Sequence, residues 1–200
     1  MAQPQLKLTY FDAKGRAELA RMIFNYGGIA FTDERITFAD LPSLKPELPH
    51  GQVPVLSVNG TVYAQSMAIV RYAANLTGLY PSDPLQALKA DMFSYSLDEL
   101  EAPYVEALYF TQDETAKAQK KKVLIEETVP TLLAALDKMV TGKFIAGDNL
   151  SFADIKLLDM LDNRLKSAFP DFNVDKFPKL AAVLTNVKAD PKIAAYLSKQ

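Results

Sequence analysis

The chain has 200 residues, enough for one large domain or two small ones, and its 49% hydrophobic content is ordinary for a folded globular protein. A formal net charge of −2 gives no electrostatic reason to expect nucleic acid or an anionic membrane as a partner. The sequence contains no cysteine, which excludes disulfides, thiolate metal sites and a cysteine nucleophile, and its single histidine, His50, excludes a histidine-rich metal site. Any thiol chemistry must therefore come from a co-substrate.

Targeting signals are not evident in the sequence. The first residues lack an apolar stretch behind a basic one, and no apolar run approaches the length that spans a bilayer. We therefore expect a soluble cytoplasmic protein without a membrane partner.

The first part of the chain alternates short strands with a helix. Residues 6–10 alternate apolar and polar side chains, as a half-buried strand does. Residues 16–26 carry apolar side chains at helical spacing until a glycine pair ends the pattern, and residues 31–36 predict a second strand. Residues 37–49 contain three prolines and no clean period, which predicts an irregular segment with at most a short helix.

Residues 55–63 predict a tight hairpin. Two short, β-branched-rich runs flank Asn59-Gly60, a dipeptide that tolerates positive φ at both turn positions. Pro54 opens the first run, where its missing N–H costs no ladder bond, and the sequence leaves its peptide bond cis or trans. Ser66 precedes a helical pattern, so we expect it to be the N-cap of a helix whose N-terminal amides suit a carboxylate or phosphate.

The rest of the chain predicts helices only. Residues 80–84 form a proline-rich linker. Residues 85–110 and 114–141 predict two long helices, the second kinked at Pro130.

A capping box marks a further helix. Ser151-Phe-Ala-Asp154 has the required spacing, with aspartate in place of the usual glutamate. Apolar residues at helical spacing follow it as far as Leu165, which predicts a buried helix. Shorter helices over 177–189 and 190–198 are expected to close the chain.

Three motifs together resemble the glutathione-binding core of cytosolic glutathione transferases. They are Gly51-Gln52-Val53-Pro54-Val55-Leu56, Gln65-Ser66-x-Ala68-Ile69-x-Arg71-Tyr72, and Tyr10-Phe11 with Gly15-Arg16-Ala17-Glu18. The third motif is similar to the sigma class, which includes glutathione-dependent prostaglandin D synthases and S-crystallins. The resemblance implies an α/β thioredoxin-like βαβαββα domain over 1–79, a linker over 80–84 and an all-α domain over 85–200, assembled as a homodimer.

Tyr10 is the catalytic candidate that the resemblance implies. A thiol with a pKa of roughly 8.5–9 is mostly protonated at neutral pH, and a hydrogen bond donated to the sulfur favours the thiolate. Arg16, at the start of the first predicted helix, would add a cation near the same atom. From the residues alone, Tyr10 could equally be an edge-strand aromatic and Arg16 a surface ion-pair partner.

The resemblance also implies which residues bind glutathione. Gln65 and Ser66 carry over to the γ-glutamyl end, Val53 with Pro54 to the cysteinyl backbone, and Lys45 and Gln52 to the glycyl end, while Glu99 would reach the amino group from the partner subunit. Leu41 stands where the sigma pattern usually has a tryptophan that contacts the glycyl carboxylate. We therefore expect weaker glutathione binding or a substitute donor.

The expected electrophile pocket is the least constrained part of the site. The resemblance assigns to it Phe11, Ala13, Tyr104 and Lys156. A lysine at position 156, where the family often has an aromatic residue, argues against a prostaglandin-like substrate.

The acidic residues of the segment 85–110 do not predict a metal site. Asp98 and Glu99 are adjacent and would point about 100° apart on a helix. Prostaglandin-synthase relatives place three aspartates here, and Tyr95 and Glu99 occupy two of these positions. We expect no metal and no tightly bound cofactor.

The combined interpretation is a glutathione transferase that attaches glutathione, its co-substrate, to small hydrophobic electrophiles, or uses it in peroxide reduction or isomerisation. Two alternatives stay open. One is a non-catalytic sigma-type relative, either an S-crystallin-like structural protein or a ligand carrier. The other is a scaffold that uses the fold for protein contacts.

Overall fold

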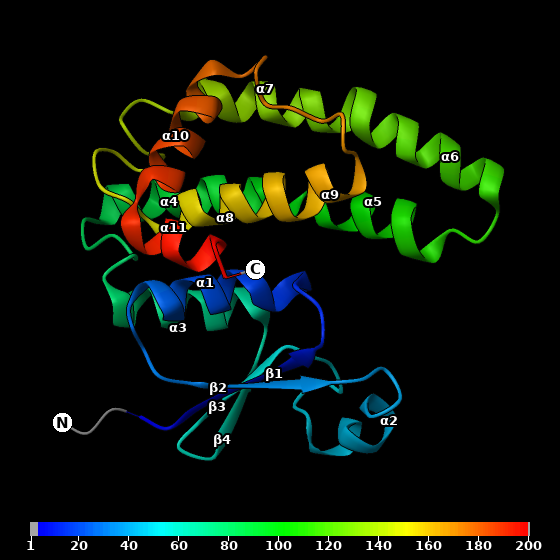
Figure 1. Ribbon diagram of the computed structural model, residues 1–200, viewed down its shortest axis with the longest axis vertical. Coiled ribbons are helices and arrows are strands. Elements are labelled where there is room, and N and C mark those ends of the chain that lie inside the picture. The colour runs from blue at the N-terminus through cyan, green and yellow to red at the C-terminus, as the bar shows by residue number, and fades with distance from the viewer. Residues whose placement is uncertain (1–3, 200) are drawn as a thin grey trace. The chain divides into compact units, whose positions relative to one another are not determined.

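The computed structural model describes residues 4–199, which form two compact units (Figure 1). The N-terminal unit comprises the residues up to Tyr80 together with those from Asp190 onward, and the helical unit comprises Pro81–Ala189. The sequence-based division into 1–79, 80–84 and 85–200 stays a prediction, and its outer ends, residues 1–3 and 200, lie outside the described residues.

The N-terminal unit is built on a mixed four-stranded sheet in the order β2-β1-β3-β4. β1 pairs in parallel with β2 and antiparallel with β3, and β3 pairs antiparallel with β4. The predicted hairpin turn is confirmed, because Asn59 and Gly60 have φ values of 51° and 89°. The strands are β1 (Leu6–Phe11), β2 (Thr32–Ile36), β3 (Val55–Val58) and β4 (Thr61–Ala64).

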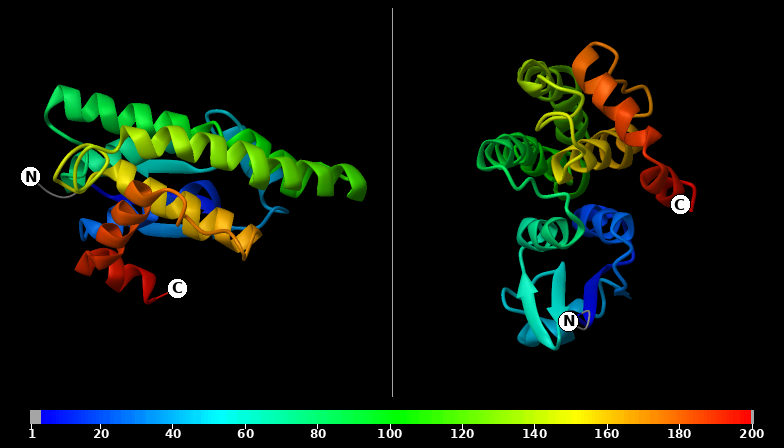
Figure 2. Two further views of the ribbon diagram at one scale, coloured as in Figure 1. Left: turned by 90° about the horizontal axis from the view of Figure 1, so that it is seen from above. Right: turned by 90° about the vertical axis from the view of Figure 1, so that its left-hand side faces the viewer.

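Helices α1 and α3 lie side by side on one face of this sheet (Figures 1 and 2). A short 3₁₀ turn, Gly15–Ala17, leads into α1, and the irregular segment predicted over 37–49 holds the short α2 followed by another 3₁₀ turn, Lys45–Glu47. The C-terminal helix α11 packs on α1. The helices of this unit are α1 (Glu18–Tyr26), α2 (Leu41–Leu44), α3 (Ser66–Thr77) and α11 (Pro191–Leu197).

The expectation that Ser66 is the N-cap of α3 is wrong. The helix starts at Ser66, and the N-cap position is Gln65, with a φ of 74°. Because β4 ends at Ala64, a single residue must turn the chain from strand into helix, and Gln65 takes the unusual backbone conformation that this requires. The helix buries Ile69, Val70, Ala73 and Ala74, whereas Leu76 near its end is 42% exposed.

The helical unit contains α4 (Pro84–Asp98), α5 (Glu101–Val105), α6 (Glu114–Val123), α7 (Val129–Met139), α8 (Phe152–Leu158), α9 (Lys166–Ala168) and α10 (Pro178–Ala189). Wider π-helical turns extend three of these helices, over Glu106–Phe110, Leu124–Thr128 and Asp159–Leu165. Within residues 4–199, no helix is both long and apolar enough to cross a membrane.

The prediction of one continuous helix over 85–110 is wrong. α4 ends at Asp98 and α5 begins at Glu101. Pro103 explains the break, because proline has no N–H for a helical bond and its ring crowds the carbonyl four residues earlier, that of Glu99. Pro84, assigned to the linker, is instead the first residue of α4, capped by the Asp83 carboxylate.

The second long helix is confirmed as helical but is distorted near its proline. The π-helical turn Leu124–Thr128 ends two residues before Pro130, and such an irregularity is the kind that a missing N–H produces. The two closing helices are also confirmed, as α10 and α11.

The capping box at the start of α8 is confirmed. Asp154 is fully buried, and its Oδ2 accepts hydrogen bonds from Ser151 N at 2.8 Å and Ser151 Oγ at 2.7 Å. Its Oδ1 accepts from Ile145 N at 2.8 Å, so the carboxylate also anchors the preceding loop. Burial raises the pKa of Asp154 to about 6 against the opposing effect of these hydrogen bonds. The expected buried face follows, with Ile155, Leu158, Leu161 and Leu165 in the core.

Candidate active site

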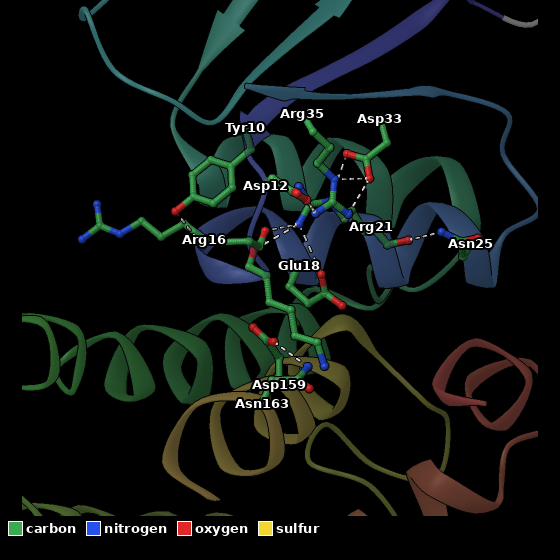
Figure 3. A network of polar contacts seen from close by, with 12 residues as sticks. Tyr10, Asp12, Arg16, Glu18, Arg21, Asn25, Asp33, Arg35, Asp159 and Asn163 are labelled. Atoms are coloured by element: carbon green, nitrogen blue, oxygen red, sulfur yellow. Dashed lines mark hydrogen bonds and ion pairs between the residues drawn. The ribbon is translucent and has the colours of Figure 1, made fainter. Parts of the chain in front are cut away.

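Tyr10 lies near the end of β1, next to the turn that leads into α1 (Figure 3). Its hydroxyl oxygen accepts a hydrogen bond from Arg16 N at 3.2 Å. Gly15, with a φ of +43°, allows this approach, because a Cβ at that position would lie 2.6 Å from the Tyr10 hydroxyl oxygen. A hydroxyl that accepts from the backbone still has its own proton to donate, so Tyr10 can act as a hydrogen-bond donor to a ligand.

A buried arginine, Arg21, holds the loop between Tyr10 and α1 (Figure 3). It is 2% exposed, and its Nη1 donates to the carbonyl oxygens of Ala13 at 2.8 Å and Lys14 at 3.1 Å. The same nitrogen lies 3.3 Å from the Glu18 carboxylate, and Nε donates to Asp33 on β2 at 3.0 Å. The guanidinium therefore ties the loop to both α1 and β2.

Sequence reasoning missed Arg21. The signal that could have found it was the spacing of Glu18 and Arg21, an i, i+3 pair of opposite charges inside a helix whose other residues are mostly apolar. The guanidinium carbon also lies 5.9 Å from the centre of the Tyr10 ring, close enough for a cation–π contact.

A shallow depression lies at the N-terminus of α3 and is open to solvent. It is lined by Arg16, His50, Gln52, Val53, Pro54, Ala64, Gln65 and Ser66. The structure thus brings together Arg16 and most of the residues expected to hold glutathione, and the Val53–Pro54 peptide bond is cis. The first amides of a twelve-residue helix, an arginine and polar side chains suit an anionic, peptide-like ligand.

His50 is a lining residue that the sequence did not assign to this pocket; its position directly before the Gly51-Gln52-Val53-Pro54 motif was the available signal. Lys45 is exposed and does not line the depression, but its side-chain stem faces Gly51, where an added Cβ would lie 3.7 Å from Lys45 Cγ.

The other predicted site residues divide between the two units. Phe11 and Ala13 follow Tyr10 in the N-terminal unit. In the helical unit, Glu99 is exposed at the break after α4. Tyr104 is 7% exposed and donates to the carbonyl oxygen of Arg164 at 3.3 Å, and burial raises its pKa to about 12.

Lys156 does not present its charge to a pocket. The residue is 5% exposed, and its Nζ donates to Ser94 O at 2.8 Å, Ser94 Oγ at 3.0 Å and Asp98 Oδ1 at 2.6 Å. Burial lowers the pKa of Lys156, and the Asp98 carboxylate opposes that shift. Because these contacts engage all three ammonium donors, Lys156 holds α8 to α4, which argues against the predicted role in an electrophile pocket.

The sheet order and the two helices on one face of the sheet define a thioredoxin-like domain, here followed by a helical unit. The chain belongs to the glutathione S-transferase family: the family model for the N-terminal domain matches residues 6–75, and that for the C-terminal domain matches residues 98–200. Members of this family use glutathione as co-substrate, bind hydrophobic substrates and are commonly dimeric.

Known relatives match along nearly the whole length. Hematopoietic prostaglandin D synthase of Gallus gallus is 35% identical over 98% of this chain and 97% of its own. S-crystallin SL11 of Nototodarus sloanii is 34% identical over the same shares. The solved structure of prostaglandin synthase D from Nilaparvata lugens superposes with a TM-score of 0.89 at 31% identity, covering 98% of both chains. These similarities confirm the predicted fold and the prediction that the chain is a sigma-like glutathione transferase.

Proposed function

We propose that this glutathione transferase activates the glutathione thiol through the Tyr10 hydroxyl. The observation that carries the proposal is the hydrogen bond from Arg16 N to Tyr10, which occupies the hydroxyl oxygen as an acceptor and leaves its proton to be donated to sulfur. A hydrogen bond to the thiolate is stronger than one to the thiol, so the contact lowers the thiol pKa. The Arg16 side chain, which lines the depression beside α3, adds a positive charge.

Glutathione would lie along that depression. The γ-glutamyl carboxylate would bind at Gln65 and Ser66, where α3 begins, and the cysteinyl backbone would pair with Val53. Gln52 and Lys45 would bind the glycyl carboxylate. Activation releases the thiol proton to solvent. The thiolate then bonds to an electrophilic carbon, and either a leaving group departs with its bonding pair or a π pair moves to the neighbouring atom, which takes a proton from solvent.

A homodimer is proposed from an exposed apolar stripe on α4. Leu85, Leu88, Met92 and Tyr95 are 69%, 62%, 49% and 56% exposed and recur at helical spacing, so they share one face of the helix. A stripe of this kind is typical of a surface that a second copy covers. Glu99 follows the stripe, where it could reach a glutathione amino group bound to the partner subunit. Sedimentation at micromolar concentration tests whether the protein is a dimer.

The cytoplasmic location is a separate point and stays a prediction from the sequence.

The Tyr10→Phe variant tests the mechanism. Glutathione is held mainly by its carboxylates and backbone, so its affinity should stay within a few-fold. Turnover should fall by roughly 10–100-fold, the range expected when a charge-assisted hydrogen bond of about 1.5–3 kcal/mol is lost. The ionisation midpoint of bound glutathione, followed by the ultraviolet absorbance of the thiolate against pH, should rise. An unchanged midpoint would assign activation to another group.

The S-crystallin likeness makes a non-catalytic relative the second candidate. Conjugation of glutathione to 1-chloro-2,4-dinitrobenzene distinguishes the two, because a structural or carrier protein would bind glutathione without turnover. The presence of Tyr10, Arg16, Gln65 and Ser66 favours the enzyme.

A further inference from the structure

A stacked aromatic pair, the half-buried Phe11 and the exposed Phe38, borders Tyr10. Phe38 follows β2 and is 77% exposed, the highest value among the large apolar side chains that the structure describes as exposed. Its ring stacks on that of Phe11, with centroids 4.1 Å apart and planes inclined by 24°. The Phe11 ring in turn lies 5.3 Å from that of Tyr10. The two phenylalanines therefore extend an aromatic surface outward from the tyrosine.

The turn that carries Phe38 is closed by its neighbours. Thr37 N and Thr37 Oγ1 both donate to Asp40 Oδ2, at 2.7 and 2.6 Å, and Asp40 N donates to Thr37 O at 3.2 Å. The hydrogen bonds from Thr37 lower the pKa of the Asp40 carboxyl, so it is ionised at neutral pH and keeps these contacts.

The loop that follows Phe11 is fixed to the same strand. Asp12 N donates to the carbonyl oxygen of Ile36 at 3.1 Å, and the Asp12 carboxylate lies 3.4 Å from Arg35 Nη1. Both rings are thus attached to short, hydrogen-bonded turns on neighbouring strands. A ring that is already positioned loses little conformational entropy when a ligand stacks on it.

We propose that Phe38 is a specificity-determining residue that extends the electrophile site and favours substrates with an aromatic ring. The inference rests on the proposed function, since Tyr10 marks where the sulfur lies. An aromatic group carried close to the reacting carbon, directly or through a neighbouring atom, would stack against the free face of Phe38, in the offset or tilted arrangement that ring pairs prefer. An aliphatic group of the same reach would gain only ordinary apolar contact.

Two isothiocyanates that share one reaction test this selectivity. In each, the glutathione sulfur bonds to the central carbon, the carbon–nitrogen π pair moves to nitrogen, and the nitrogen takes a proton from solvent. Benzyl and propyl isothiocyanate differ in the group carried by that nitrogen. Phe38→Leu should lower the ratio of their kcat/KM values, benzyl over propyl, by roughly 3–10-fold, the value of an aromatic pair, and leave propyl turnover within about twofold.

Matched variants test whether the change in the ratio is specific to the ring of Phe38. Tyr63→Leu removes another exposed aromatic ring of the N-terminal unit, 53% exposed on β4, and should leave the ratio unchanged. Phe38→Tyr keeps a ring at the position and should retain the wild-type ratio. Because Phe38 is so exposed, Phe38→Leu should unfold at the wild-type urea concentration.

A binding measurement keeps the inference testable without turnover. Calorimetry with S-benzylglutathione and S-propylglutathione gives the same comparison at equilibrium, and Phe38→Leu should weaken the benzyl compound selectively. Equal losses for both compounds, or none, would overturn the role of Phe38. Failure of the proposed function is a separate outcome, recognised by an unshifted ionisation midpoint of bound glutathione in wild-type protein.

Discussion

Two buried charged groups, one in each unit, are held in contrasting ways. Arg21 in the N-terminal unit contacts two backbone carbonyls and two carboxylates, yet its Nη2 has no hydrogen-bond partner among the described residues. In the helical unit, both carboxylate oxygens of Asp154 accept hydrogen bonds, and these donors lie within ten residues of Asp154 in the sequence. The contacts of Arg21 join α1, β2 and the loop after Tyr10, whereas those of Asp154 close one helix start.

The difference separates a group that shapes the active site from one that stabilises the fold. A buried donor without a partner costs free energy. The Arg21 cluster, which is Arg21 with Glu18 and Asp33, is therefore not arranged for stability alone. Its Nη1 fixes the carbonyls of Ala13 and Lys14, immediately before the turn that sets Arg16 N against Tyr10. We therefore expect changes at Arg21 to alter both stability and thiol activation, and changes at Asp154 to alter stability only.

The largest effect is expected for Arg21→Met. It leaves the buried Glu18 carboxylate without its cation, and breaking a buried ion pair from one side costs about 3–5 kcal/mol of unfolding free energy. Turnover per folded molecule should also fall, because the loop over Tyr10 loses its anchor. Urea unfolding and the ionisation midpoint of bound glutathione measure the two effects.

Arg35→Met is the matched control for that experiment. Arg35 is also paired with Asp33, at 2.8 Å, but its side chain is 37% exposed, so its loss should cost no more than about 1 kcal/mol. Arg21→Lys sharpens the comparison, since lysine keeps the charge but cannot bond both carbonyls and Asp33 with a planar fork. Full activity in Arg21→Lys would show that charge alone matters.

An intermediate effect is expected for Asp154→Asn. The amide nitrogen would face the two Ser151 donors in place of Oδ2, which should cost about 1–3 kcal/mol of unfolding free energy, without a change in turnover per folded molecule. Reduced turnover at unchanged glutathione affinity would contradict the separation of roles.

The pH dependence of that variant follows from the raised pKa of Asp154. A carboxyl whose pKa rises from 3.8 to about 6 on folding adds stability that is fully present below the lower value and is lost as pH rises through the higher one. The stability difference between wild type and Asp154→Asn should therefore shrink with rising pH across this interval. Asp148→Asn, at an exposed position in the preceding loop, should show no such trend.

How far the sequence predicted the fold depends on whether local or distant contacts decide a feature. The Asn59-Gly60 turn and the Ser151–Asp154 capping box are local, and both were predicted correctly. The start of α3 was not, because the abrupt end of β4 puts the unusual backbone at Gln65 rather than a cap at Ser66. The break at Glu99 could have been predicted from Pro103, but residues 85–110 were predicted as one continuous helix.

The candidate site shows the same division. The family resemblance assigned Arg16, Gln52, Val53, Gln65 and Ser66 to one site, and the structure places them around one depression. Arg21, His50 and Phe38 were not assigned to the site, because what draws attention to each is its contact with, or nearness to, residues of other elements. Lys156 was assigned to a pocket wall from the family resemblance, and no local pattern predicts its bonds to Ser94 and Asp98, some sixty positions earlier in the chain.

The smallest effect is expected for Tyr196→Phe. The Tyr196 hydroxyl of α11 donates to Glu18 Oε1 at 2.9 Å, so it supports the Arg21 cluster from one side only. Glu18 would keep its contact with Arg21, and losing one partly buried hydrogen bond to a charged group should cost about 1.5 kcal/mol, the low end for such bonds, with turnover close to wild type. Tyr63→Phe, at an exposed position on β4, should cost nothing measurable. If Tyr196→Phe instead shifted the ionisation midpoint of bound glutathione as far as Arg21→Lys does, α11 would help to position the loop over Tyr10, and the cluster would extend to the C-terminal helix.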